Sequence, residues 1–142
     1  TADLGGIGGT LAGNALSVVA MKATLKDVLN DRYYERAIML QEMFTAGVEG
    51  VIRELELPWI VKWLGNRTEY WFCPSAPHNG GEAEAAMDEE LDRYMHLYSL
   101  NRGILLTPFH NMALICPEVT EADVRHHTSV FREAVLSIID ER

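Results

Sequence analysis

The most constraining feature of this sequence is a glycine-rich stretch near its beginning, which leads directly into an apolar helical pattern. Five of the ten residues from Gly5 to Asn14 are glycine, and the only hydroxyl among them belongs to Thr10. Glycine allows backbone conformations and close approaches that a β-carbon forbids. Residues 15–29, which follow, have the apolar spacing of a helix. The pattern predicts a loop that lies against another group at the start of a helix.

Two interpretations of this loop follow from the residues alone. Backbone N–H groups that lead into a helix N-terminus form an anion site, which favours a phosphate loop. The two common nucleotide loops do not fit. Asn14 and Ala15 stand where a P-loop needs Lys followed by Ser or Thr, and Leu11 stands where a dinucleotide loop needs glycine. A structural turn and a phosphate loop of another kind both remain open.

A resemblance to a known family extends along most of the chain. Residues 9–16, Gly-Thr-Leu-Ala-Gly-Asn-Ala-Leu, resemble the G-T-x-x-G-N-P-L segment of class III (fold type I) pyridoxal-phosphate aminotransferases, and most of all their glutamate-1-semialdehyde aminomutase-like branch. The resemblance continues, in the same order, through residues 70–72, 101–106 and 120–124. In that family the strand and turn with the Schiff-base lysine precede this segment. The resemblance therefore implies that the chain is the C-terminal part of a larger enzyme, which moves an amino group on an amino-acid-type substrate.

The resemblance also implies roles for individual residues. Gly9 and Thr10 match family residues at the interface of a homodimer. There the threonine donates a hydrogen bond to the phosphate of a pyridoxal 5'-phosphate cofactor held mainly by the neighbouring subunit. The turn that contains Thr107, His110 and Asn111 would face the mouth of the active site and the substrate.

The strand predicted at residues 112–116 departs from part of the family. Members that act on ornithine-like substrates have an arginine there, which binds the substrate carboxylate with two hydrogen bonds. This chain has Met-Ala-Leu-Ile-Cys and no arginine at that place. The difference favours the aminomutase-like branch. Ala15, where the family often has proline, does not change the assignment, because proline there only pre-sets the backbone.

Composition excludes several kinds of partner. The chain of 142 residues has 21 acidic and 12 basic side chains, for a formal charge of -9. Nucleic acid and anionic membranes bind clustered Lys and Arg, so neither is expected as a partner. The five histidines lack the spacing of metal ligands, so no metal is expected. Cys73 and Cys116 lie in apolar segments, which indicates reduced thiols and a cytoplasmic protein.

Periodicity predicts an α+β fold. Helices are expected at residues 14–30, 31–57, 87–101 and 120–138, and strands at residues 59–64, 68–73, 104–107 and 112–116. This order predicts a small, mostly antiparallel sheet of three to four strands with helices packed on one side, as in the C-terminal small domain of fold type I enzymes.

Local signals add detail to this prediction. Asp31 and Thr120 are expected to begin helices, and residues 74–84 are expected to form a polar loop. Gly47 and Gly50 indicate either a close helix crossing or glycines that the helix simply tolerates.

Three regions are expected from the resemblance. Residues 1–13 would belong to the large domain and dimer interface of the whole enzyme, residues 14–30 would form a connecting helix, and residues 31–142 would form the small domain.

No set of residues in the chain has the pattern of a complete catalytic site. Lys22, Lys26 and Lys62 are its only lysines, and none is assigned a catalytic role. The chain alone is therefore expected to be inactive and not to bind the cofactor. The alternative class is a non-catalytic, dimeric α+β interaction module, which the sequence leaves open.

Overall fold

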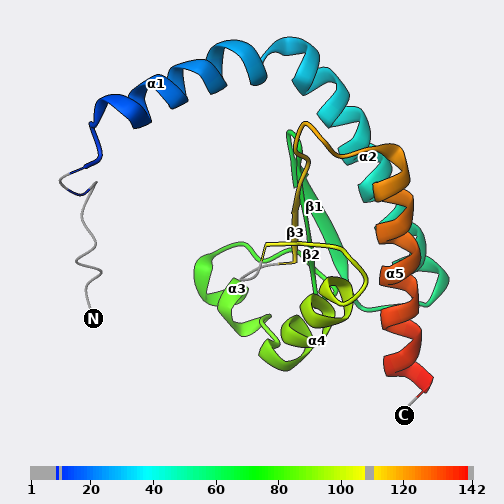
Figure 1. Ribbon diagram of the computed structural model, residues 1–142. Helices are drawn as coiled ribbons and strands as arrows, with labels where there is room; N and C mark the ends of the chain where they lie inside the picture. Colours follow the sequence, from blue (N-terminus) through cyan, green and yellow to red (C-terminus); the bar gives the residue numbers. More distant parts are fainter. Residues whose placement is uncertain (1–8, 10, 108–110, 141–142) are drawn as a thin grey trace. The chain divides into compact units, whose positions relative to one another are not determined.

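The computed structural model describes residues 9, 11–107 and 111–140. Contacts divide the chain into two compact units, residues 1–35 and 36–142 (Figure 1). Among the described residues, no helix is long and apolar enough to cross a membrane.

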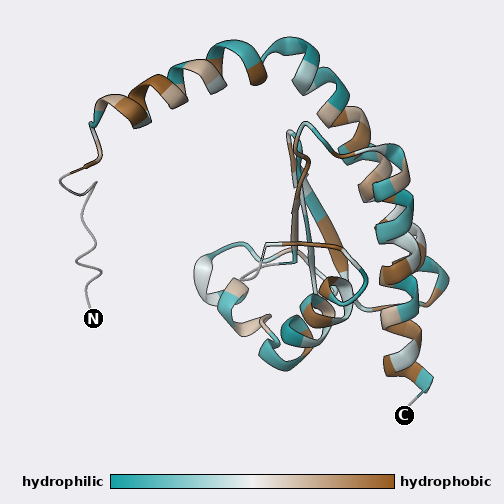
Figure 2. Cartoon of the chain, in the orientation of Figure 1, coloured by the Kyte–Doolittle hydropathy of each residue, from teal (hydrophilic) through white to brown (hydrophobic). Residues whose placement is uncertain are grey.

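The first unit is helical, and the side chains of its helices are not buried. Helix α1 (Ala15–Ala23) continues into a π-helical turn, η1 (Thr24–Val28), and neither contains a buried residue. Asn14 caps α1, because its Oδ1 accepts a hydrogen bond from the backbone N–H of Ser17 at 3.0 Å. The apolar residues of α1 form brown bands in Figure 2. The predicted helix is present, and its apolar side chains are exposed.

Helix α2 (Asp31–Glu54) begins in the first unit and forms one wall of the second. Its cap is Asn30 and not the predicted Asp31: Oδ1 of Asn30 accepts from the backbone N–H of Tyr33 at 3.1 Å. Asp31 lies instead in the first turn, where its negative charge interacts favourably with the positive end of the helix dipole. After Glu54 the chain leaves the helix through Glu56, whose φ of 52° is left-handed.

A three-stranded antiparallel sheet forms the centre of the second unit. Strands β1 (Ile60–Leu64), β2 (Arg67–Trp71) and β3 (Met112–Leu114) lie in the order β1-β2-β3. The predicted hairpin is confirmed, and its turn contains Gly65 with a φ of 59°. Thr68 in β2 pairs with Ala113 in β3, so these two side chains point to the same face of the sheet.

The predicted strand at residues 104–107 is not formed. Gly103 ends the preceding helix with a φ of 79°, and the backbone N–H of Ile104 still donates to Ser99 at 3.0 Å. This segment therefore leaves the helix at an angle that brings only its far end to the sheet. There the N–H of Thr107 donates to the carbonyl of Met112 at 3.3 Å.

Three further helices complete the second unit, and each begins with a side-chain cap. Helix α3 (Gly80–Ala85) lies in the segment predicted to be a loop, because Asn79 accepts from the N–H of Glu82 at 3.0 Å. Asp88 caps α4 (Glu89–Leu100) in the same way. Thr120 begins α5 (Glu121–Asp140), as predicted from a capping box.

The core lies between one face of the sheet and helices α2 and α5. Its centre is polar: Nε2 of Gln41 donates to Oγ1 of Thr45 at 2.6 Å and to Oγ1 of Thr68 at 2.9 Å. All three side chains are buried, so these bonds satisfy groups that water cannot reach. From α5, the ring of Phe131 packs 5.0 Å from that of Tyr70. Helices α2 and α5 therefore pack on one face of the sheet.

Helices α2 and α5 lie side by side in Figure 1 and approach each other closely at Gly47. A β-carbon at position 47 would overlap Oγ1 of Thr128 and lie 3.1 Å from its Cγ2. A β-carbon at position 50 would meet no described atom within 4 Å. The close crossing is confirmed for Gly47 and not for Gly50.

We expect Gly47→Ala to lower the free energy of unfolding by about 1–3 kcal/mol, because the added methyl group overpacks a closed helix contact. Gly50→Ala, the matched control, should raise it by up to about 1 kcal/mol through helix propensity. Urea unfolding of both variants measures the difference. Adding Thr128→Ala to Gly47→Ala should recover most of the loss, and equal effects of the two alanines would contradict the contact.

Candidate functional site

The glycine segment ends in tight turns before α1. The N–H of Ala12 donates to the carbonyl of Gly9 at 3.0 Å, and the N–H of Asn14 donates to the carbonyl of Leu11 at 3.1 Å. Gly9 is exposed. Thr10, the predicted phosphate ligand, lies outside the described residues.

Gly9 does not need to be glycine for any contact within the described chain. A β-carbon added to Gly9 or Gly13 would meet no described atom within 4 Å. A steric reason for glycine at these positions must therefore come from a group outside the described part of the chain.

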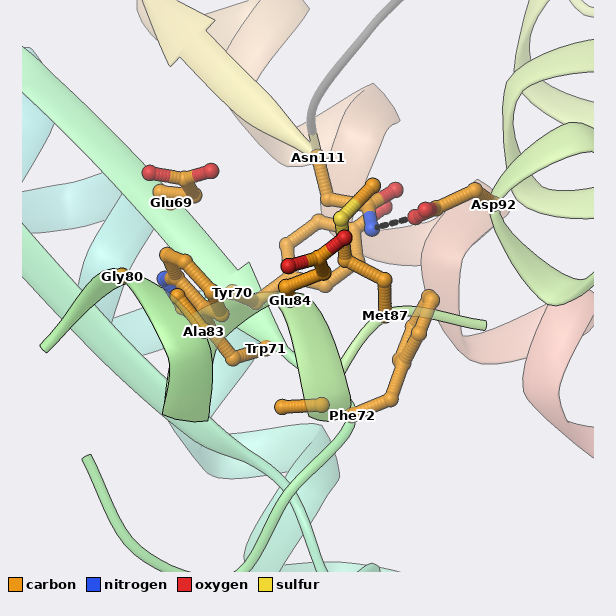
Figure 3. A pocket seen from close by; sticks show the side chains of 11 residues that line it. Glu69, Tyr70, Trp71, Phe72, Gly80, Ala83, Glu84, Met87, Asp92 and Asn111 are labelled. Carbon is orange, nitrogen blue, oxygen red and sulfur yellow. Dashed lines mark hydrogen bonds between the residues drawn. The ribbon is translucent and has the colours of Figure 1, made fainter. Parts of the chain in front are cut away.

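A hollow of about 250 Å³ lies at the far end of strand β2, between helices α3 and α4 (Figure 3). Its apolar walls include Trp71, Phe72 and Met87, and its carboxylates belong to Glu69, Glu84 and Asp92. Asn111, one of the predicted substrate-facing residues, also lines it.

Asn111 is held in this hollow from two sides. Its backbone carbonyl accepts from the N–H of Tyr70 at 3.2 Å, which continues the β2–β3 pairing, and its Nδ2 donates to Oδ1 of Asp92. Figure 3 draws this bond across the hollow. Thr107 is half-buried and is not among the lining residues, while His110 lies outside the described residues. Of the predicted turn, the structure thus brings Asn111 to a cavity.

The hollow is acidic, and its buried hydroxyl is neutral. Tyr70 is 2% exposed, and its hydroxyl has no hydrogen-bond partner. Burial, and then the charge of Asp92, raise the pKa of Tyr70 far above its usual value. No Lys, Arg or His is among the described lining residues. This arrangement suits a neutral or positively charged group and opposes a phosphate.

Two of the groups in the hollow were not predicted from the sequence. Asp92 lies on α4 among other acidic residues, and nothing in its own segment marks it as the partner of Asn111. Tyr70 belongs to an aromatic segment of β2, and such a segment is typical of a hydrophobic core. Asp92 and Asn111 meet only because α4 packs beside the end of the sheet, and the sequence does not give this packing.

Other catalytic chemistry has no support in the described part of the chain. Lys22, Lys26 and Lys62 are all exposed, so none is enclosed in the core. The described residues contain no group of three His, Cys, Asp or Glu side chains that could hold a metal ion.

The fold is that of the C-terminal part of class III transaminases. An omega-transaminase from Sphaerobacter thermophilus matches 92% of this chain with 30% of its own, at a TM-score of 0.73 and 20% sequence identity. A likeness at this level of identity defines the fold alone. No family model matches the chain.

At the level of sequence, the chain is similar to glutamate-1-semialdehyde aminomutases. A crystal structure of such an enzyme from Pseudomonas aeruginosa PAO1 matches 97% of this chain, with 45% identity and a TM-score of 0.88. A variant of that enzyme in complex with PMP matches 95% of it, with 46% identity and a TM-score of 0.85. The aminomutase of Chlamydia pneumoniae is 24% identical over 93% of the chain.

These likenesses confirm the resemblance predicted from the glycine segment and the three segments that follow it. The chain spans 30% of the length of each of these aminomutases. It corresponds to their C-terminal part.

We expect Asn111→Asp to lower the free energy of unfolding by about 1–3 kcal/mol at pH 7, because it places a second carboxylate against Asp92. Repulsion raises the pKa of one carboxyl above its unfolded value. The loss should therefore shrink as the pH falls through about 4, where one carboxyl is protonated. Denaturant unfolding at pH 7 and pH 4 measures this. Combining Asn111→Asp with Asp92→Asn restores one charge and should recover much of the loss; a loss independent of pH would count against the pair.

Proposed function

We propose that this chain is the C-terminal part of a pyridoxal 5'-phosphate-dependent enzyme of the glutamate-1-semialdehyde aminomutase type. Such an enzyme moves an amino group on an amino-acid-type substrate. The observation that carries the proposal is the likeness to the Pseudomonas aeruginosa aminomutase, in sequence and in fold, over nearly the whole chain. The PMP complex of the related variant supports the cofactor.

The glycine segment is the part of the chain that fits the cofactor phosphate. The exposed backbone of Gly9, with free space around it, lets a phosphate oxygen come close. The hydroxyl of Thr10 is a neutral donor, which can hold a dianion in place without adding charge. The hollow beside Asn111 does not fit a phosphate, because its carboxylates repel one. When bound, the cofactor supplies an electron sink for the substrate; Gly9 and Thr10 would fix the position of its phosphate.

The turn from Thr107 to Asn111 would meet the substrate. Asp92 accepts the bond from Nδ2 of Asn111 and so fixes the orientation of the carboxamide. The carbonyl oxygen Oδ1 is then available to accept from a substrate N–H. We place Thr107 and His110 on the same side of the substrate, as the resemblance implies.

The enzyme would be a homodimer in the cytoplasm. Residues 1–13 would belong to the large domain and the dimer interface, and residues 31–142 would form the small domain. Residues 14–30 would form the helix that connects these two regions. The apolar side chains of α1 support a partner, because Leu16 is 81% exposed and Val19 is 64% exposed. Large apolar surfaces of this kind are usually covered in an assembly. We assign the covering surface to a second copy.

The proposed activity can be tested on the full-length protein with pyridoxal 5'-phosphate and glutamate 1-semialdehyde. An aminomutase converts the substrate to an isomer of the same mass, with the amino group moved between carbons 1 and 2, and needs no second substrate. A transaminase would instead need an added 2-oxo acid and would release an amino acid. The 142-residue chain alone should do neither, since its lysines are exposed. If the full-length protein retains no cofactor and catalyses neither reaction, a non-catalytic interaction module becomes the better explanation.

We expect Thr10→Ala in the full-length protein to weaken retention of pyridoxal 5'-phosphate about tenfold to hundredfold, with a smaller effect on the maximal rate. A hydrogen bond to a charged group contributes about 1.5–3 kcal/mol, and the other phosphate contacts remain. Titration of the apoenzyme with cofactor, followed by activity and by subunit mass, measures both effects. Thr10→Ser, which keeps the hydroxyl, is the control and should lose much less affinity. If the affinity for the cofactor is unchanged and the maximal rate collapses, Thr10 does not contact the phosphate.

A further inference from the structure

The face of the sheet that points away from α2 and α5 is covered at one end and open at the other. At the covered end, Glu69 and Trp71 are partly buried beside α3 (Figure 3). At the open end, next to the hairpin turn, Leu64 in β1, Arg67 in β2 and Leu114 in β3 are neighbours across the strands. All three are exposed, Leu64 by 74% and Leu114 by 57%. The open end therefore presents two large apolar side chains on either side of one cation.

Leu105 extends this apolar surface. It is 79% exposed while the next residue, Leu106, is buried, so the segment turns one side chain outwards and the next into the core. Leu105 and Leu114 both line a hollow of about 200 Å³ between residues 103–106 and β3, which places them close together. Single exposed leucines are common, but several that gather in one place are typical of a contact surface. Leu64, Leu105 and Leu114 together form the leucine surface.

The leucine surface adjoins the residues that we assign to the substrate. Leu105 lies two residues before Thr107, and Leu114 lies three residues after Asn111. The backbone N–H of Thr107 donates to the carbonyl of Met112 at 3.3 Å, which joins the two segments. The segments that carry these leucines therefore also hold both ends of the turn predicted to face the substrate. In the enzyme proposed above, that turn faces an active site whose lysine precedes this chain.

We propose that the leucine surface packs against the part of the full-length enzyme that precedes this chain, within the same subunit. The inference rests on the proposed function, because it needs the longer enzyme. The chain spans 30% of the length of the Pseudomonas aeruginosa aminomutase and corresponds to the C-terminal part of such enzymes, so most of such an enzyme precedes it. A preceding part that meets the substrate beside Thr107 and Asn111 comes within a few residues of Leu105 and Leu114.

The chemistry of the leucine surface defines the surface that covers it. That surface is apolar and places a carboxylate opposite Arg67, because a buried cation without a partner is costly. The contact lies within one subunit, since the two parts are joined in one chain and pay less entropy to associate than two separate molecules do.

The first test measures how fast N-ethylmaleimide labels single cysteines in the full-length protein, with Cys73 and Cys116 replaced by serine. Leu105→Cys and Leu114→Cys probe the leucine surface. Ser129→Cys is the matched control, because Ser129 is exposed on α5, which packs on the opposite face of the sheet. Relative to the same variant in urea, positions 105 and 114 should label about tenfold more slowly than position 129, because a covered side chain reacts only when the contact opens. Equal relative rates at the three positions would overturn the proposal.

The second test identifies what covers the leucine surface. The photo-reactive residue p-benzoylphenylalanine replaces Leu105 in the full-length protein, and mass spectrometry locates the cross-linked peptide in an equal mixture of isotopically labelled and unlabelled subunits. We expect a cross-link to a peptide that precedes this chain, with both peptides carrying the same isotope. Cross-links between labelled and unlabelled peptides would show that a second copy covers the surface, and would overturn the proposal.

Neither measurement depends on activity, so the two proposals can fail separately. An active aminomutase whose leucine surface labels freely would contradict this inference and leave the proposed function standing. A covered surface in a protein that retains no cofactor and converts no substrate would contradict the proposed function and leave the contact standing.

Discussion

The hydrogen bonds among Gln41, Thr45 and Thr68 are the constraint on which the second unit depends. Each of these side chains is buried, so each must find its partner inside the protein. Gln41 and Thr45 are one helical turn apart on α2, and both meet Thr68 on β2. A shift of β2 by one residue would turn Thr68 to the opposite face and leave the α2 groups unsatisfied. The polar contact therefore fixes the register of the strand against the helix.

This register also determines which side chains of β2 point to each face of the sheet near the hollow beside Asn111. With Thr68 turned to α2, Tyr70 points to the same face and packs on Phe131, while Glu69 and Trp71 point away. The hollow lies where these two sets of side chains meet α3 and α4 at the end of β2. The register of β2 thus places the hydroxyl of Tyr70, the carboxylate of Glu69 and the ring of Trp71 around the hollow, while Glu84 and Asp92 come from α3 and α4.

Most elements could be predicted from the sequence because their signals are local. The capping box of Thr120 and Asp123, the glycine of the hairpin turn and the apolar stripe of α2 all act within a few residues. The predicted strand at 104–107 failed because strand formation depends on where Gly103 directs the chain after α4. The burial of Gln41 was missed because its partner Thr68 is 27 residues away. In the candidate site, the resemblance singles out Asn111, whose role stays a prediction, and its contact with Asp92 depends on the packing of α4 against the rest of the fold.

The absence of any buried residue in α1 and η1 has a consequence for folding. Isolated helices shorter than about 12–15 residues are marginal in water, because the first turn fixes several residues for one hydrogen bond. Helix α1 has nine residues and the π-helical turn η1 that continues it has five, with a cap at Asn14 and no buried residue in either. In the homodimer that we propose, most of its helical stability would come from the surface that covers it, so the coil-to-helix transition of this segment and its association would be one thermodynamic event. Such a segment would order when the second copy binds and fray when it leaves, which would link the geometry of the glycine loop before it to the state of assembly.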